Sequence, residues 1–307
     1  MSTDSNCGCL SVRTAAIAVS IASITTCVKK KDKVISMAFK IAFASERPAE
    51  KQNEAAYITQ KVQTAPRKSV VQVRFPGRGM ALAYYNDLFD LKCGDMVYVD
   101  GKLEGMLGCV TEVNYNFKIK ISDYKCVIAV VDTTVHGQFF IAGSHIVTFD
   151  REALPNNKVV RWFKAPANED DEFVSGSDDT TFRLGDLKGM NVSSAIAERG
   201  HEYYLENKVR YISIDGTKGY AVVEGSESYE VEFEYRNGEV GQLICSCFCS
   251  YNCKHEFAAM LQLKETLELI GKHYEDEYER TGYFAAINKG TLFAFAIDGK
   301  DTGSFTL

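Results

Sequence analysis

The chain has 307 residues, of which 46% are hydrophobic and 25% are charged, the ordinary balance of a globular protein with about two domains. Its net charge is −6, which excludes a protein whose whole surface contacts nucleic-acid phosphates, because such contacts need clustered lysine and arginine. A local basic patch is still compatible with this charge.

Residues 1–68 are predicted to be an N-terminal extension that contains an apolar segment and a polar linker. The apolar run from Ala15 to Val28 has about fourteen residues, fewer than the roughly 20 that a membrane-spanning helix needs. Lysines follow this run, whereas a signal peptide carries its positive charge in front. We therefore expect a cytoplasmic protein without a membrane partner. A second methionine, Met37, leaves open whether residues 1–36 are a genuine part of the protein.

Residues 69–165 are predicted to form a β-rich domain. Short β-branched and aromatic runs, such as VVQVRF, DMVYVD and CVIAVV, alternate with turn-forming Gly, Asp and Asn, which predicts a small antiparallel barrel or sandwich. Cys93, Cys109 and Cys126 are scattered through this region and are expected to be buried as small apolar residues. The next stretch, 166–180, is acidic and poor in large aliphatic residues, which predicts a solvated linker.

Residues 181–275 are predicted to form a helix, an antiparallel sheet and a second helix. The first helix is expected at 192–207, where Ser193 or Ser194 can cap it. Three strands follow, and the last, SYEVEFEY, alternates apolar residues with glutamates as a half-buried strand does. An Asn-Gly turn then leads into GQLICSC. The predicted fold class is therefore α+β, with residues 276–307 as a C-terminal hairpin or tail.

A dense group of cysteines and one histidine follows the last of these strands, in the sequence ICSCFCSYNCKHEF. Cys245 and Cys247 leave the same face of a strand end, because side chains alternate along a strand. Cys253 and His255 begin an amphipathic helix. Three thiolates and one imidazole are a ligand set that tetrahedral zinc prefers. Four protein ligands leave no open coordination position, so we expect one structural Zn²⁺.

Cys249 offers an alternative ligand set, in which it replaces Cys245 beside Cys247, Cys253 and His255. We favour the set with Cys245, because that residue follows the strand directly. The three residues between Cys249 and Cys253 also give the chain little room to turn.

The spacing Cys-x-Cys-x5-Cys-x-His resembles the SWIM zinc finger, whose pattern is Cys-x-Cys, a variable gap and Cys-x-His. The preceding AIAERGHEYYLENKVRYISIDG and VVEGSESYEVEFEY also resemble the SWIM arrangement found beside bacterial SNF2-type helicases. This resemblance covers residues 181–270 and implies that Cys245, Cys247, Cys253 and His255 are the zinc ligands. Four residues of the first helix match the family motif and are expected to pack against neighbours: Arg199, Gly200, Tyr203 and Tyr204.

SWIM modules occur in ATPases, transposases and ubiquitin ligases and are predicted to bind DNA or proteins. The resemblance therefore implies a non-catalytic recognition module that is accessory to a nucleic-acid enzyme, with an SNF2-type ATPase as a candidate partner. The alternative is a protein–protein interaction adaptor without direct nucleic-acid binding. We expect no enzymatic activity and no small-molecule substrate, because the sequence has no Gly-x4-Gly-Lys-Ser/Thr phosphate loop and no nucleophile motif.

If nucleic acid binds, the β-rich region is the better candidate surface, because basic and aromatic side chains are mixed there, whereas residues 181–275 carry Glu-rich strands. The residues concerned are Arg67, Lys68, Arg74, Arg78, Lys118, Lys120, Lys125, Arg151, Lys158, Arg161 and Lys164, with Tyr84, Tyr85, Tyr115 and Phe117.

Overall fold

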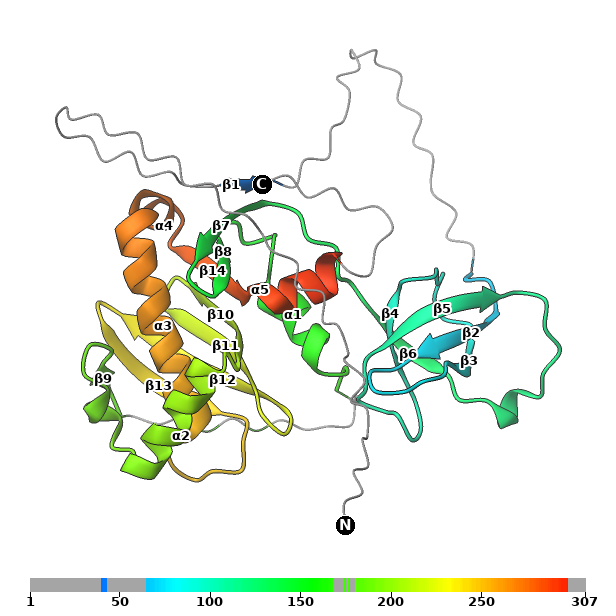
Figure 1. The fold of residues 1–307 in the computed structure, drawn as a ribbon, viewed down its shortest axis with the longest axis horizontal. Coiled ribbons are helices and arrows are strands. Elements are labelled where there is room, and N and C mark those ends of the chain that lie inside the picture. Colours follow the sequence, from blue (N-terminus) through cyan, green and yellow to red (C-terminus); the bar gives the residue numbers. More distant parts are fainter. Residues whose placement is uncertain (1–39, 43–64, 168–173, 175, 177–179, 298–307) are drawn as a thin grey trace, which may run out of the picture. The chain divides into compact units, whose positions relative to one another are not determined.

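The computed structural model describes residues 40–42, 65–167, 174, 176 and 180–297 (Figure 1). Most of the expected extension 1–68 and of the expected linker 166–180 lies outside the described residues. Among the helices that are described, none is both long enough and apolar enough to cross a membrane.

The first of two antiparallel sheets has five strands in the order β3-β2-β5-β4-β6. These strands and the 3₁₀ helix before the last of them are β2 (Ser69–Arg74), β3 (Leu82–Asn86), β4 (Met96–Val99), β5 (Gly108–Asn114), η1 (Ile121–Asp123) and β6 (Val127–Val131). Valines on one face of β2, β4 and β6 are buried together, among them Val71, Val97 and Val127. This sheet therefore has a core of its own, as the alternating sequence predicts.

The barrel expected in this region does not close. In the described residues, its edge strands β3 and β6 meet at one isolated bridge between Tyr85 and Cys126, beside the bond from the Tyr85 amide to the Lys125 carbonyl, 2.8 Å. A closed barrel needs a continuous ladder between these edges. The Cys126 amide instead donates to the Asp100 carboxylate at 2.5 Å, so it is not available to continue that ladder.

The second sheet has nine strands in the order β1-β7-β8-β14-β10-β11-β12-β13-β9, all antiparallel. The strands are β1 (Lys40–Ala42), β7 (Gln138–Ala142), β8 (His145–Thr148), β9 (Phe182–Arg183), β10 (Val209–Asp215), β11 (Lys218–Glu224), β12 (Ser228–Arg236), β13 (Glu239–Cys245) and β14 (Tyr283–Asn288). The segment from β10 to β13 is a meander, and its four strands lie where the sequence predicts them.

The strands of the nine-stranded sheet come from more than one of the segments that the sequence predicts. Strands β7 and β8 lie within 69–165, yet they pair in the nine-stranded sheet. In 276–307, the described residues form no hairpin, because β14 lies alone between β8 and β10. All six residues of β14 are buried, since both faces of the sheet are covered, and such a strand has no alternating pattern that would reveal its place.

Helices cover both faces of this sheet (Figure 1). On one face are η2 (Leu187–Met190), α2 (Ser194–Leu205), α3 (Lys254–His273) and α4 (Glu275–Thr281). On the other are α1 (Asn156–Phe163), α5 (Lys289–Leu292) and the π-helical turn η3 (Phe293–Ile297). Helix α2 begins as predicted, because the Ser193 side chain caps it by accepting from the Ile196 amide at 3.4 Å.

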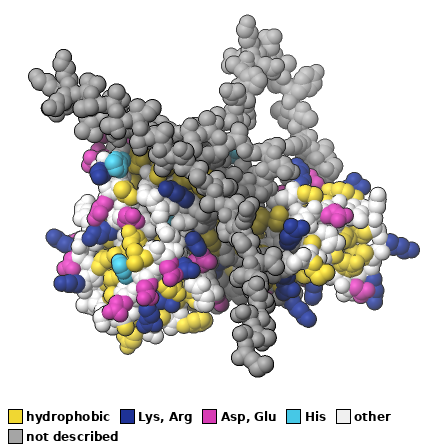
Figure 2. Space-filling view, in the orientation of Figure 1, with side chains coloured by type: hydrophobic (Ala, Val, Ile, Leu, Met, Phe, Trp, Pro, Cys, Tyr) yellow, Lys and Arg dark blue, Asp and Glu magenta, His cyan; other side chains and the backbone are white. Residues whose placement is uncertain are grey.

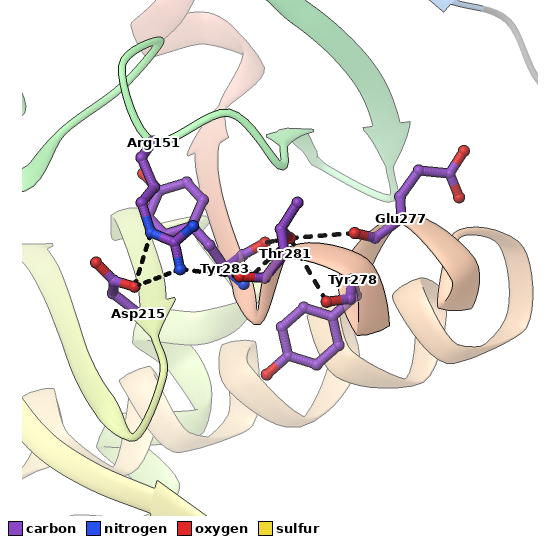
Figure 3. Close-up of polar contacts among 6 residues, drawn as sticks. All are labelled: Arg151, Asp215, Glu277, Tyr278, Thr281 and Tyr283. Carbon is purple, nitrogen blue, oxygen red and sulfur yellow. Dashed lines mark hydrogen bonds and ion pairs between the residues drawn. The ribbon is translucent and has the colours of Figure 1, made fainter.

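A polar cluster lies where β8 and β10 end and β14 begins, on the same side of the sheet along the strand direction (Figure 3). Arg151 donates from Nε to the Asp215 carboxylate at 3.0 Å and from Nη2 to the Thr281 carbonyl at 2.8 Å. Its guanidinium lies 5.2 Å from the centre of the Tyr283 ring. The Thr281 hydroxyl in turn donates to the Glu277 carbonyl at 3.1 Å. The cluster thus links the chain after β8 to the end of β10 and to the residues just before β14.

Candidate metal centre

The Cys/His cluster lies where the meander ends and α3 begins. Cys245 is the last residue of β13, where it pairs with Val231, and Cys253 is the N-cap of α3. The loop between these elements is anchored by Asn252, whose side-chain amide donates to the Met190 carbonyl at 2.6 Å. Strand, loop and helix therefore bring the side chains to one place, as the sequence predicts.

Four side chains converge there: Cys245, Cys247, Cys253 and His255 each offer one ligand atom within 4.8 Å of the others. His255 Nδ1 is 3.8 Å from Cys245 Sγ and 3.7 Å from Cys253 Sγ. In a tetrahedral zinc site, bonds of about 2.3 Å to sulfur and 2.0–2.1 Å to nitrogen separate sulfur from nitrogen by about 3.6 Å. The group therefore fits a tetrahedral metal ion with three sulfur ligands and one nitrogen ligand.

The cap of α3 orients Cys253. The Glu256 amide donates to Cys253 Sγ at 3.5 Å, and the Glu256 carboxylate accepts from the Cys253 amide at 2.6 Å. This reciprocal pair is a capping box in which a thiol takes the place usually held by a hydroxyl. The helix dipole directs its positive end toward this sulfur and favours the thiolate.

The three clustered thiols do not ionise alike. The pKa of Cys253 is lowered to about 4, first by the hydrogen bond from the Cys245 thiol and also by those from His255 and the Glu256 amide. That same bond, together with burial, raises the pKa of Cys245. Desolvation is the main cause that raises the pKa of Cys247 to about 11. The hydrogen bonds therefore favour the thiolate at Cys253, and a bound cation would favour ionisation of all three thiols.

Two tyrosines surround the His255 ring, and the sequence did not predict this contact. The Tyr229 ring stacks on it at 4.1 Å between centroids with an interplanar angle of 16°. The Tyr203 ring lies 5.5 Å away, with Lys254 Nζ 4.5 Å from the Tyr203 ring centre. The alternating sequence of β12 places Tyr229 on the inward face, and this was the available signal. The contact of Tyr229 with His255 depends on how α3 packs against the sheet, which the pattern of one strand does not reveal.

Cys249 does not belong to this group of four, and its side chain is exposed. The loop between Cys247 and Cys253 also exposes two aromatic side chains, with Phe248 at 104% and Tyr251 at 85% of full exposure. The geometry therefore supports the ligand set with Cys245 over the alternative set.

The scattered cysteines are less buried than expected. Cys109 and Cys126 are half-buried, and Cys93 is exposed, with its thiol donating to the Thr111 carbonyl at 3.4 Å. Burial raises the pKa values of Cys109 and Cys126. These thiols are therefore not the fully buried apolar residues that the sequence suggested.

The expected nucleic-acid surface is not assembled as a stacking platform. Tyr84 and Tyr85 are buried, at 5% and 3% exposure. Half-buried Phe117 lies edge-on to Tyr85 with centroids 6.3 Å apart, and Arg67 lies over half-buried Tyr115, 4.1 Å from its ring centre. Basic and acidic side chains are interspersed over the described surface in view (Figure 2).

Several of the expected basic residues pair with neighbouring carboxylates. These ion pairs are Arg151–Asp215 at 2.9 Å, Lys158–Asp132 at 2.8 Å and Lys164–Glu230 at 2.6 Å. Their charge is thus balanced locally, which weakens their use for binding phosphates.

Comparison with known proteins gives a local match. A curated relative, "Uncharacterized protein MJ1493" of Methanocaldococcus jannaschii, is 38% identical over 69 residues, which are 22% of this chain and 29% of the relative. The chain therefore matches well under two thirds of that relative's length. No family model matches the chain, and no solved structure matches it.

Proposed function

We propose that this protein binds one structural zinc ion through Cys245, Cys247, Cys253 and His255 in a SWIM-type module. The observation that carries the proposal is the convergence of these four ligand atoms within 4.8 Å of one another. Three sulfurs and one imidazole nitrogen suit zinc better than calcium or magnesium, which prefer oxygen ligands. The order of strand, Cys-x-Cys, loop and Cys-x-His at a helix start supports the SWIM assignment.

The role of such a metal is to hold the loop. Structural zinc in small modules contributes about 10–16 kcal/mol of binding free energy at neutral pH, comparable with the 5–15 kcal/mol net stability of a typical domain. All four positions of a tetrahedral ion are filled by protein. This supports a site that has no chemistry of its own.

Metal content tests the assignment directly. We expect the purified wild type to hold one equivalent of zinc by mass spectrometry of the metal. Cys253→Ser removes a buried sulfur of the cluster and is expected to hold substantially less. The matched control is Cys249→Ser, which changes an exposed cysteine of the same loop and is expected to keep the full equivalent. A Cys253→Ser variant with undiminished zinc would refute the ligand set.

We also propose that the zinc module is a non-catalytic recognition element, accessory to a nucleic-acid enzyme of the SNF2 type. The alternative, a protein-interaction adaptor, is favoured by Phe248 and Tyr251, because exposed aromatic side chains are typical of protein contact sites. No charged residue lies between Cys247 and Cys253, whereas phosphate binding needs lysine or arginine.

Salt dependence of oligonucleotide binding separates these two functions. Direct nucleic-acid binding predicts an affinity that falls steeply as salt rises, because counterions are released from the phosphates. The adaptor predicts no binding of single- or double-stranded oligonucleotides even at low salt. Fluorescence anisotropy with the zinc-loaded full chain measures both.

A further inference from the structure

The metal cluster does not account for the surroundings of the second ring nitrogen of His255, Nε2. Nδ1 is the atom that approaches the sulfurs of Cys245 and Cys253, so a neutral imidazole that binds metal there carries its proton on Nε2. His255 is 4% exposed, and its Nε2 is buried without a hydrogen-bond partner among the described residues. A buried N–H donor without an acceptor is costly, so this proton needs an acceptor.

Gly225 lies beside both this nitrogen and a tyrosine hydroxyl. It follows β11 and has no side chain, and a Cβ built there would lie 3.0 Å from Tyr229 Cε2, 3.3 Å from the Tyr203 hydroxyl oxygen and 3.4 Å from His255 Nε2. The two polar atoms therefore border one point in space. A methyl group at this position would lie against both of them, whereas glycine leaves them free to approach each other.

The two tyrosines around His255 differ in what their hydroxyl groups do. The Tyr229 hydroxyl is 2.8 Å from the Ser226 hydroxyl, and its ring stacks on the imidazole, so Tyr229 holds the plane of the ring. The Tyr203 hydroxyl lies beside Gly225, as His255 Nε2 does, and the Tyr203 ring is 5.5 Å from the imidazole, while the Lys254 ammonium group lies over the Tyr203 ring. Tyr203 is thus the hydroxyl placed to serve Nε2.

We propose that Tyr203 is a positioning residue for His255, whose Nε2–H donates to the Tyr203 hydroxyl when Nδ1 binds the metal. Gly225 is the residue that permits this approach. Such an outer partner fixes the tautomer and orientation of a ligating histidine and makes it a stronger ligand. The inference rests on the metal site proposed above and assigns the residue that tunes it.

Zinc affinity of the full chain, measured by competition with a chelator, tests the proposal. We expect Tyr203→Phe to weaken zinc binding by about tenfold or more, the usual effect of losing an outer partner. Gly225→Ala should act in the same direction, because its Cβ would press against the Tyr229 ring, the Tyr203 hydroxyl and His255 Nε2. The matched control is Tyr204→Phe, which deletes the hydroxyl of the neighbouring tyrosine of α2, where it interacts with Glu265 of α3, so its affinity should be unchanged.

A spectroscopic readout distinguishes positioning from general loosening. In long-range ¹H–¹⁵N spectra of the zinc-loaded protein, the His255 Nε2 proton should exchange slowly in the wild type and in Tyr204→Phe. It should exchange rapidly in Tyr203→Phe. If Tyr203→Phe binds zinc like the wild type and keeps the slow proton, the role of Tyr203 is refuted and the metal site stands. If the wild type binds no zinc, the metal site fails and this role fails with it.

Discussion

His145, in β8, is a buried histidine with a partner on each ring nitrogen. Nε2 is 2.8 Å from the Val209 carbonyl oxygen, and Nδ1 is 2.9 Å from the Ser144 hydroxyl. Because a carbonyl only accepts, Nε2 carries the proton and Nδ1 accepts from Ser144. Burial lowers the pKa of His145 to about 4, and the charges of Arg210 and Lys289 act in the same direction.

This histidine predicts a loss of stability in mild acid. The unfolded chain binds a proton at His145 below a pKa near 6.5, whereas the folded chain does so only near 4, so stability falls as pH drops through that interval. The difference amounts to about 3 kcal/mol at full effect. Urea unfolding between pH 7 and 4 should show a shallower decline for His145→Gln than for the wild type. Equal slopes would contradict the assignment.

The side chains of the Cys/His cluster could be predicted from sequence, but their neighbours could not. Cys253 and His255 are separated by one residue along the chain, so the spacing of sulfur and nitrogen reveals them. Tyr203 and Gly225 come from α2 and the turn after β11, and only tertiary packing brings them to His255. The sequence pattern likewise misplaced Tyr84 and Tyr85, because an aromatic residue in a short strand reads the same whether its ring faces the core or solvent.

Among the helices, α2 and α3 are packed at a glycine. A Cβ at Gly200 would lie 2.8 Å from Phe257 Cβ and 3.0 Å from the Lys254 carbonyl oxygen. That carbonyl belongs to the first turn of α3, between Cys253 and His255. Close contact of the helices therefore also fixes the backbone that carries half of the Cys/His cluster.

Gly200→Ala is expected to destabilise the protein although alanine favours helix. The higher helix propensity of alanine stabilises the fold by up to about 1 kcal/mol, but overpacking costs about 1–3 kcal/mol. The net free energy of unfolding should therefore decrease. Gly271→Ala is the matched control, because a Cβ at this exposed position of α3 meets nothing within 4 Å. It should gain up to about 1 kcal/mol. Urea unfolding measures both, and a stabilised Gly200→Ala would overturn this account.

Elements with local signals were predictable, and those defined by distant pairing were not. Helix α2 has a serine cap, and β10 to β13 are joined in sequence order, so their places follow from local pattern. β14 has neither signal. Its Ile287 pairs with Tyr211 of β10 on one side, and its Ala285 pairs with Thr148 of β8 on the other. A short apolar run does not indicate partners so far away in the chain.

The nine-stranded sheet depends on β14 as a whole, because this strand joins its two parts. Truncation after Gly282 removes β14 and should abolish cooperative unfolding of the sheet, seen as lost protection in amide hydrogen exchange of β8 and β10. Tyr283→Phe is the control, since it keeps the strand and removes a hydroxyl that donates to the Leu154 carbonyl at 3.3 Å and interacts with Tyr211, at a cost of about 1 kcal/mol for a hydrogen bond. A truncated chain that still protects β8 and β10 would contradict this role.

The late position of β14 in the chain also affects folding during biosynthesis. The ribosome makes β7 and β8 long before it makes β14, which lies beside β8 in the sheet. The edge of β8 therefore stays unpaired while the meander and the cysteine loop are synthesised. Cells would be expected to shield that edge, because unpaired strand edges invite association between chains. Slowing translation of the segment that follows β8 should therefore increase aggregation of the nascent protein, measured as the fraction that sediments.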